Sequence, residues 1–184
     1  MRVILLALGL GMLLLAGPAL AEEAADFELE DLNGDEYTLD DLLEDNTLLV
    51  IDFWQVGCKP CNELVAHLQE FYDEYQEDEA GVEIVIISRD TSLTLPQVAP
   101  FFNSHEYTFK VLLDTELDVS ADYGVKASPV TFLITPDKQI IWRHFNYKSG
   151  QEEEIREMID DYLAGEEIAD EASEYEDEYE DEEE

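Results

Sequence analysis

Apolar residues between positions 27 and 164 fall into two kinds of pattern, and each predicts a different kind of element. Nearly continuous apolar runs at 47–54 and 82–88 predict strands covered on both faces, because such strands have no side turned toward water. Shorter β-prone runs predict three further strands, at 109–113, 130–135 and 139–145. The last two flank the turn sequence Pro136-Asp137-Lys138, so we expect them to form an antiparallel hairpin.

Other segments carry apolar residues three and four positions apart, which is the spacing of an amphipathic helix. The longest predicted helix begins at Cys61 and continues through Tyr75. Acidic residues separate its apolar positions, so one face is expected to pack on the sheet while the other meets water. Three more helices are predicted at 96–105, 117–123 and 151–164.

The predicted domain opens with two short runs of alternating polarity, at 27–32 and 37–39. They meet at Asn33-Gly34, a pair that tolerates the positive φ of a tight turn, and so predict a β-hairpin. From the N-terminus, the elements then run hairpin, βαβα and ββα. This order predicts an α/β fold in which a central mixed sheet is flanked by helices and carries an added N-terminal β-hairpin.

Acidic residues dominate the composition: 47 Asp and Glu stand against nine Lys and Arg in 184 residues, a formal net charge of −38. The hydrophobic content of 46% argues against a disordered chain, and the length fits one ordinary domain. So negative a surface repels phosphates and anionic lipid, which excludes nucleic acid and makes any charged partner cationic. We expect a monomer.

The N-terminal segment, 1–21, has the layout of a secretory signal peptide. It begins with Met1-Arg2, continues through an apolar run and ends in the small-residue pattern Ala19-Leu20-Ala21. An uncleaved membrane anchor is the alternative, because the run is near the length that spans a bilayer. We expect cleavage after Ala21, no stable membrane insertion afterwards and a periplasmic location.

The C-terminal segment, 166–184, contains 13 acids and no base, and we expect it to be a disordered, solvated tail. Binding of cations or of a basic partner is the alternative. The remaining segment, 22–165, is the predicted folded domain and still carries 34 acids against eight bases. This acidity indicates a high-salt habitat, in which ions screen the repulsion.

Two cysteines, Cys58 and Cys61, enclose Lys59-Pro60 at the junction of a predicted buried strand and the longest predicted helix. Unpaired N–H groups and the positive dipole end at a helix start stabilise a thiolate, which is the nucleophilic form of cysteine. Cys58 is expected at the exposed tip, with Cys61 one turn later on the apolar face. This asymmetry predicts one attacking and one resolving thiol in a redox-active pair.

Two other uses of the cysteine pair stay open. The first is an inert structural disulfide, although a loop this short removes little entropy from the unfolded chain. The second is a metal site, which needs about four ligands. Only the isolated histidines His67, His105 and His144 are available to join the thiolates. We therefore expect no metal and no cofactor.

The CxxC sequence and its surroundings resemble the thioredoxin superfamily. The resemblance rests on Ile51-Asp52-Phe53-Trp54, on the cysteine motif and on the segment 123–134. With the opening hairpin and Leu39-Asp40-Asp41-Leu42, the chain is most similar to the exported TlpA/ResA/DsbE-like branch. The resemblance implies a thioredoxin-like fold and disulfide exchange, commonly as a reductase, with cytochrome c maturation as one role of the branch.

The resemblance also implies roles for individual residues. Cys58 would attack a substrate disulfide, and Cys61 would resolve the mixed disulfide. Pro129 would follow a cis peptide bond, with the backbone at Ser128 pairing with an extended substrate. Asp52 matches a buried carboxylate that assists proton transfer from the resolving thiol, and burial would raise its pKa. A partly solvated acid at a strand end is the alternative for Asp52.

Three further residues are assigned to substrate binding. Lys59 and Pro60 lie between the two thiols, where the charge of Lys59 favours the Cys58 thiolate while nearby acids oppose it. Trp54 either walls the site or packs in the core. The chain departs from the family pattern at Gly57, where tryptophan is usual, and this leaves the choice of partner open.

These features predict an exported thiol:disulfide oxidoreductase, acting as a reductase of protein disulfides that a membrane electron donor keeps reduced. A disulfide oxidase is the alternative within this class, because the residues between the cysteines do not fix the reduction potential. From other classes, a carrier of copper or another soft metal and a binding module without redox turnover stay open.

Overall fold

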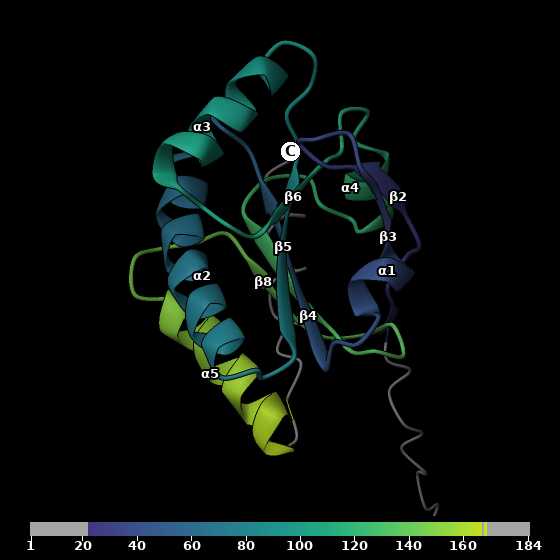
Figure 1. The fold of residues 1–184 in the computed structure, drawn as a ribbon, viewed down its shortest axis with the longest axis vertical. Helices are drawn as coiled ribbons and strands as arrows, with labels where there is room; N and C mark the ends of the chain where they lie inside the picture. Colours follow the sequence, from purple (N-terminus) through teal and green to yellow (C-terminus); the bar gives the residue numbers. More distant parts are fainter. Residues whose placement is uncertain (1–21, 167, 169–184) are drawn as a thin grey trace, which may run out of the picture.

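The computed structural model describes residues 22–166 and 168, which fold around a six-stranded sheet (Figure 1). The expected signal peptide, 1–21, lies outside these residues, as does the expected acidic tail apart from Glu166 and Ile168. Within the described part of the chain, no helix is both long enough and apolar enough to cross a bilayer.

The sheet is mixed, as the order of predicted elements indicates. In spatial order its strands are β1 (Glu22–Glu23), β8 (Gln139–Phe145), β7 (Val130–Ile134), β4 (Leu48–Trp54), β5 (Val82–Ser88) and β6 (Lys110–Leu113). Strands β4, β5 and β6 run parallel, whereas β7, β8 and β1 each pair antiparallel with their inner neighbour. Every residue of β4 and β5 is buried, because helices cover both faces of these strands.

Helices and a hairpin form the outer layers. The described helices are α1 (Leu39–Leu43), α2 (Lys59–Glu77), the 3-10 helix η1 (Leu95–Gln97), α3 (Val98–His105), α4 (Asp118–Asp122) and α5 (Glu152–Ala164). Figure 1 shows α2, α3 and α5 on one side of the sheet, with α1, α4 and the hairpin of β2 (Glu28–Glu30) and β3 (Glu36–Thr38) on the other. A hydrophobic core therefore lies on each face.

The long helix α2 packs across the middle of the sheet through the apolar stripe that its sequence predicts. Its buried residues recur three and four positions apart: Cys61, Leu64, Val65, Leu68, Phe71 and Tyr75. They share one core with residues of β4 and β5, and with Ile155 and Ile159 of α5. This packing fixes the start of α2 at the end of β4, which is where the cysteine motif lies.

The predicted N-terminal hairpin is confirmed, since β2 and β3 pair antiparallel. The helix expected at 96–105 begins with a 3-10 turn, and the other predicted elements differ from the observed ones mainly at their ends. Strand β1 was not predicted, because Glu22 and Glu23 are both exposed acids without an apolar pattern. It is held at the edge of the sheet by pairing with β8 and by an ion pair between Glu22 and Arg143.

Candidate active site

Cys58 is the N-cap residue of α2, at the point where the chain leaves β4. Its Sγ accepts a hydrogen bond from the Cys61 N–H at 3.2 Å, and its own N–H donates to the Gln55 carbonyl at 3.0 Å. Pro60 lies in the first turn, where its missing N–H costs nothing because those groups have no partner within the helix. The predicted position of Cys58 at a helix start is confirmed.

The two cysteines form a disulfide, and their Cα atoms are 5.2 Å apart. Cys61 lies on the buried face of α2 and is fully buried in the core, whereas Cys58 is partly exposed. One sulfur is thus open to an incoming molecule and the other is shielded, which is the asymmetry that the sequence predicts. The structure corresponds to the oxidised form of the pair.

The loop before β7, which contains Ser128 and Pro129, lies next to the exposed sulfur of Cys58. The Ser128–Pro129 peptide bond is cis, which is the isomer that the resemblance implies. The carbonyl oxygen of Ser128 lies 3.5 Å from the Sγ of Cys58. A disulfide sulfur carries no hydrogen, so in the oxidised protein this approach is a contact and not a hydrogen bond. Pro129 is buried, while Ser128 stays partly exposed beside Cys58.

Asp52 lies within β4 on the face covered by α2. Its alternate neighbours Val50 and Trp54 pack in the core under that helix, and side chains two positions apart share a face. Its carboxyl group is fully buried: Oδ1 accepts a hydrogen bond from the Thr131 hydroxyl at 2.9 Å, and Oδ2 has no hydrogen-bond partner among the described residues. Burial raises the pKa of Asp52 from 3.8 to about 7, while the Thr131 hydroxyl acts in the opposite direction. The partly solvated alternative is therefore wrong.

A row of polar side chains crosses the sheet from Asp52. Strand register pairs Asp52 with Thr131 of β7, and Thr131 with His144 of β8, so the three side chains share one face. His144 is buried, and its Nδ1 lies 3.8 Å from a carboxylate oxygen of Glu154. Its Nε2 has no hydrogen-bond partner within the described residues. Unpartnered buried polar atoms cost stability, and such costs are typical of functional sites.

The structure corrects the expectation that Trp54 borders the substrate. Its ring is fully buried and packs against Phe101 and Phe102, with ring centroids 5.0 and 4.9 Å away. Its Nε1 donates to Asn62 Oδ1 at 3.0 Å, and the Asn62 amide donates to the Val56 carbonyl at 3.2 Å. Of the two alternatives, the core position is therefore the correct one for Trp54. Its hydrogen bond to Asn62 also helps to hold the loop before the cysteines.

Lys59 extends from the helix start into solvent, where 88% of its side chain is exposed. Its Nζ lies 3.6 Å from a carboxylate oxygen of Glu63, one turn further along α2. Exposed ion pairs of this kind contribute little to stability. The Glu63 carboxylate nevertheless partly offsets the positive charge of Lys59 next to Cys58.

Sequence reasoning missed Thr131, Arg89 and Asp90, which contact the residues and loops around the disulfide. Thr131 is the polar residue within the apolar run of β7, and this was the signal that something polar faces it. Arg89 and Asp90 directly follow β5, whose end lies beside the end of β4. A basic and an acidic residue directly after the apolar run of β5 were the signal there.

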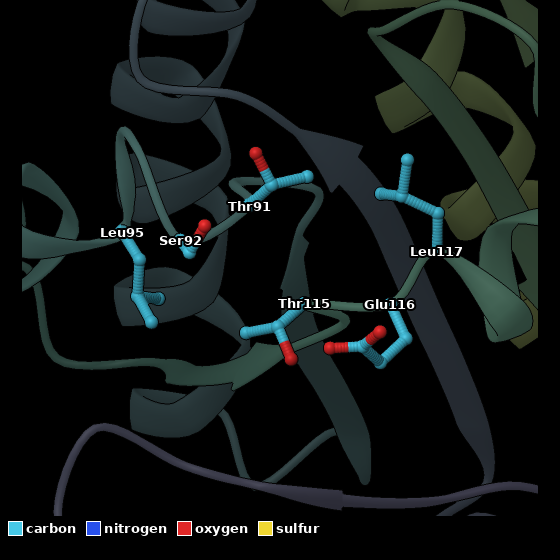
Figure 2. A pocket seen from close by; sticks show the side chains of 6 residues that line it. All are labelled: Thr91, Ser92, Leu95, Thr115, Glu116 and Leu117. Atoms are coloured by element: carbon cyan, nitrogen blue, oxygen red, sulfur yellow. The ribbon is translucent and has the colours of Figure 1, made fainter.

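The described residues also form a pocket of about 460 Å³ (Figure 2). It is formed by the loops that follow β5 and β6 and is lined by Thr91, Ser92, Leu95, Thr115, Glu116 and Leu117. None of the predicted site residues lines it, so it is not the predicted site. Within the part of the chain that the structure describes, no group of three or more His, Cys, Asp or Glu is placed to hold a metal ion.

Comparison with known proteins identifies relatives across most of the chain. Residues 20–143 match the AhpC/TSA family. The thiol-disulfide oxidoreductase ResA of Halalkalibacterium halodurans is 31% identical over 140 residues, which cover 75% of this chain and 76% of that protein. ResA of Bacillus subtilis is 34% identical over 119 residues, which cover 65% of this chain and 63% of that protein.

Solved structures show the same fold at lower sequence identity. A protein from Chlorobium tepidum, provisionally assigned as the thiol:disulfide interchange protein DsbE, has a TM-score of 0.70 and 23% identity, over 78% of this chain and 96% of that one. StoA of Bacillus subtilis has a TM-score of 0.58 and 20% identity, over 73% of this chain and 96% of that one. The chain therefore belongs to the AhpC/TSA family, as a thioredoxin-like thiol:disulfide oxidoreductase of the TlpA/ResA/DsbE-like branch.

Proposed function

We propose that the protein is an exported reductase of protein disulfides in which Cys58 attacks and Cys61 resolves. The observation that carries this proposal is the unequal exposure of the two sulfurs at the start of α2: Cys61 is fully buried and Cys58 is partly open. The Cys61 N–H already points at the Cys58 sulfur, where it would stabilise a thiolate. The disulfide form is the state that such a reductase reaches after one turnover.

The reaction begins with attack of the Cys58 thiolate on one sulfur of a substrate disulfide, which forms a mixed disulfide and releases one substrate thiolate. Cys61 then gives its proton to Asp52 and attacks the Cys58 sulfur. This second step forms the Cys58–Cys61 disulfide, releases the other substrate thiolate and completes the transfer of two electrons to the substrate. A pKa of about 7 suits Asp52 to this proton transfer, because a base works best near the operating pH.

Substrate binding is assigned to the loop around the cis peptide bond. The Ser128 carbonyl lies 3.5 Å from the Cys58 sulfur, and Ser128 is partly exposed. An extended substrate segment lying along Ser128 and Pro129 would bring its own disulfide over Cys58. Lys59 and Pro60, at the start of α2, would contact this segment from the helix side.

Replacing each cysteine separately tests the assignment of the two thiols. Cys58→Ala is expected to abolish insulin reduction, because the attacking sulfur is gone. Cys61→Ala is expected to accumulate substrate as mixed disulfides, which non-reducing gels and mass spectrometry detect. The double variant serves as the blank. Normal turnover by Cys61→Ala would contradict the two-thiol mechanism.

The direction of electron flow is set by the reduction potential of the pair. A value near the thioredoxin potential, about −270 mV, would support a reductase, whereas one near about −120 mV would support an oxidase. We infer a reductase that a membrane electron donor keeps reduced, with cytochrome c maturation as one use. Equilibration with glutathione gives the potential, and alkylation of thiols in intact cells gives the redox state that this donor maintains. Cell fractionation of the full chain tests export through the predicted signal peptide.

A further inference from the structure

Arg89 and Asp90 directly follow β5 and contact the two loops that flank the disulfide. Because β5 pairs with β4, Arg89 and Asp90 lie beside the start of the loop that leads from β4 to Cys58. The Arg89 N–H donates to the Trp54 carbonyl at 2.8 Å, which ties these two residues to the end of β4. From there the Arg89 side chain binds the cis-proline loop, and the Asp90 side chain binds the loop before Cys58.

The Arg89 guanidinium makes three hydrogen bonds to the segment that leads to the cis peptide bond. The acceptors are Ser128 Oγ at 3.2 Å from Nη1, the Val125 carbonyl at 3.1 Å from Nη2 and Ser120 Oγ at 3.0 Å from Nε. Ser120 is itself fixed, because its hydroxyl donates to the buried carboxylate of Asp114 at 2.6 Å. A planar fork of donors is what arginine supplies and lysine does not.

Arg89 is used differently from the other arginines of the described residues. Arg143 and Arg156 each pair with a glutamate carboxylate, Glu22 and Glu74 respectively. Arg89 instead donates its side-chain hydrogen bonds to two hydroxyls and a carbonyl, in a chain that has 47 acidic residues. Its contacts are therefore suited to holding a loop in place.

Asp90, next to Arg89 in the chain, holds the loop before Cys58. Asp90 is fully buried, and its Oδ2 accepts hydrogen bonds from the Val56 N–H and the Ser88 hydroxyl, each at 3.0 Å. Val56 lies two residues before Cys58 on the active-site loop. Adjacent residues thus bind the cis-proline loop and the loop before Cys58, so the distance between these two loops depends on Arg89 and Asp90.

We propose that Arg89 is a positioning residue that holds the cis-proline loop at the distance from Cys58 required to bind an extended polypeptide disulfide. The proposal rests on the proposed function, because this distance matters only if the substrate lies between the two loops. Arg89 bonds to the side chain of Ser128 and does not contact the sulfurs. Its loss should therefore weaken polypeptide binding and spare the reaction of Cys58 with a small disulfide.

Arg89→Met tests this separation, with Arg156→Met as the matched control that also removes a partly buried guanidinium. For a disulfide-bonded peptide substrate, Arg89→Met is expected to raise KM by roughly tenfold, equivalent to about 1.4 kcal/mol. The kcat value, and the rate constant for the reduced protein with dipyridyl disulfide, should stay within about twofold of wild type, a difference well below 1.4 kcal/mol. Arg156→Met should change neither substrate's kinetics.

Two kinetic outcomes overturn the proposal. An unchanged KM for the peptide would mean that the cis-proline loop keeps its place without Arg89. Equal losses with both disulfides would mean that Arg89 maintains the thiol or the whole fold. Arg89→Lys keeps the charge but not the fork, so full recovery of KM in this variant would also contradict the proposal. Ser120→Ala removes one acceptor and should raise KM in the same direction even if Arg89→Met fails to fold.

Amide hydrogen exchange of the oxidised proteins distinguishes failure of this proposal from failure of the proposed function. Faster exchange across 125–131 in Arg89→Met, but not in Arg156→Met, supports the positioning role even if the wild-type protein reduces no disulfide. Unchanged exchange in that segment overturns it, whatever the turnover of the wild-type protein.

Discussion

Replacing Asp52 with asparagine should remove a specific pH dependence from the stability of the oxidised protein. In the folded state the pKa of Asp52 is raised from 3.8 to about 7, mainly by burial, so the folded protein keeps a proton that the unfolded chain has already released. Between these two pH values, rising pH favours the unfolded chain. The stabilising contribution of the protonated group is complete below about pH 4 and is lost as the pH rises through about 7.

The size of the effect follows from the displacement of the pKa. Each pH unit between 3.8 and about 7 changes the free energy of unfolding by about 1.4 kcal/mol, so the whole interval accounts for about 4 kcal/mol. An asparagine side chain at this position would retain the shape of the aspartate without titrating. Its amide can leave a buried donor unpaired, which costs about 1–3 kcal/mol at every pH and so does not alter the slope.

Urea unfolding of the oxidised wild type and Asp52→Asn, measured from about pH 4 to pH 8 at fixed salt, gives this difference directly. The disulfide form is used because its cysteines do not titrate. Subtracting one curve from the other cancels the groups that the two proteins share. Thr131→Val is a second variant: it removes a hydroxyl that lowers the folded-state pKa of Asp52, so the fall in stability should extend to higher pH. Parallel curves for wild type and Asp52→Asn would refute the reasoning.

Three further predictions concern the scaffold. Leu68→Ala should lower the free energy of unfolding by about 2–5 kcal/mol in urea titrations, because Leu68 is fully buried beneath α2 and its loss leaves a cavity. Gly81→Ala should cost about 1–3 kcal/mol by the same measurement, since Gly81 has a φ of +73° and an added Cβ would lie 2.7 Å from Thr47 Oγ1. Raising NaCl from dilute buffer to about 1 M should raise the melting temperature, because salt at that level screens repulsion among the excess acids. An unchanged melting temperature would contradict the predicted adaptation to high salt.

The sequence predicts the fold well because most elements carry a strong local signal. Strands β4 and β5 are buried on both faces, so their apolar runs identify them as strands even when the strands they pair with are not known. The stripe of α2 and the turn of the β2–β3 hairpin are equally local. β1 could not be predicted, because its two exposed glutamates are in a strand only through pairing with β8, more than a hundred residues away in the chain.

The candidate site was predictable to the extent that it is contained in one motif. The helix start fixes the exposure of Cys58 and Cys61, whereas the burial of Asp52 was implied by the family resemblance. Arg89 and Thr131 could not be assigned from the pattern, because their roles depend on which strands become neighbours and on where each side chain points. The same limit applied to Trp54, whose fully buried ring settles the choice between site wall and core.

The acidic surface and the Cys58 thiolate of the proposed mechanism make opposite electrostatic demands, and these act over different distances. A net charge of −38 disfavours further negative charge, yet interactions between exposed charges more than about 8–10 Å apart are largely screened at moderate salt. The Cys61 N–H acts on the Cys58 sulfur at 3.2 Å, where no ion can intervene. High salt therefore weakens the opposing surface charges and leaves the helix start in control of the sulfur. In the proposed mechanism, this lets so acidic a chain keep Cys58 reactive beside Lys59, which is exposed and paired with Glu63.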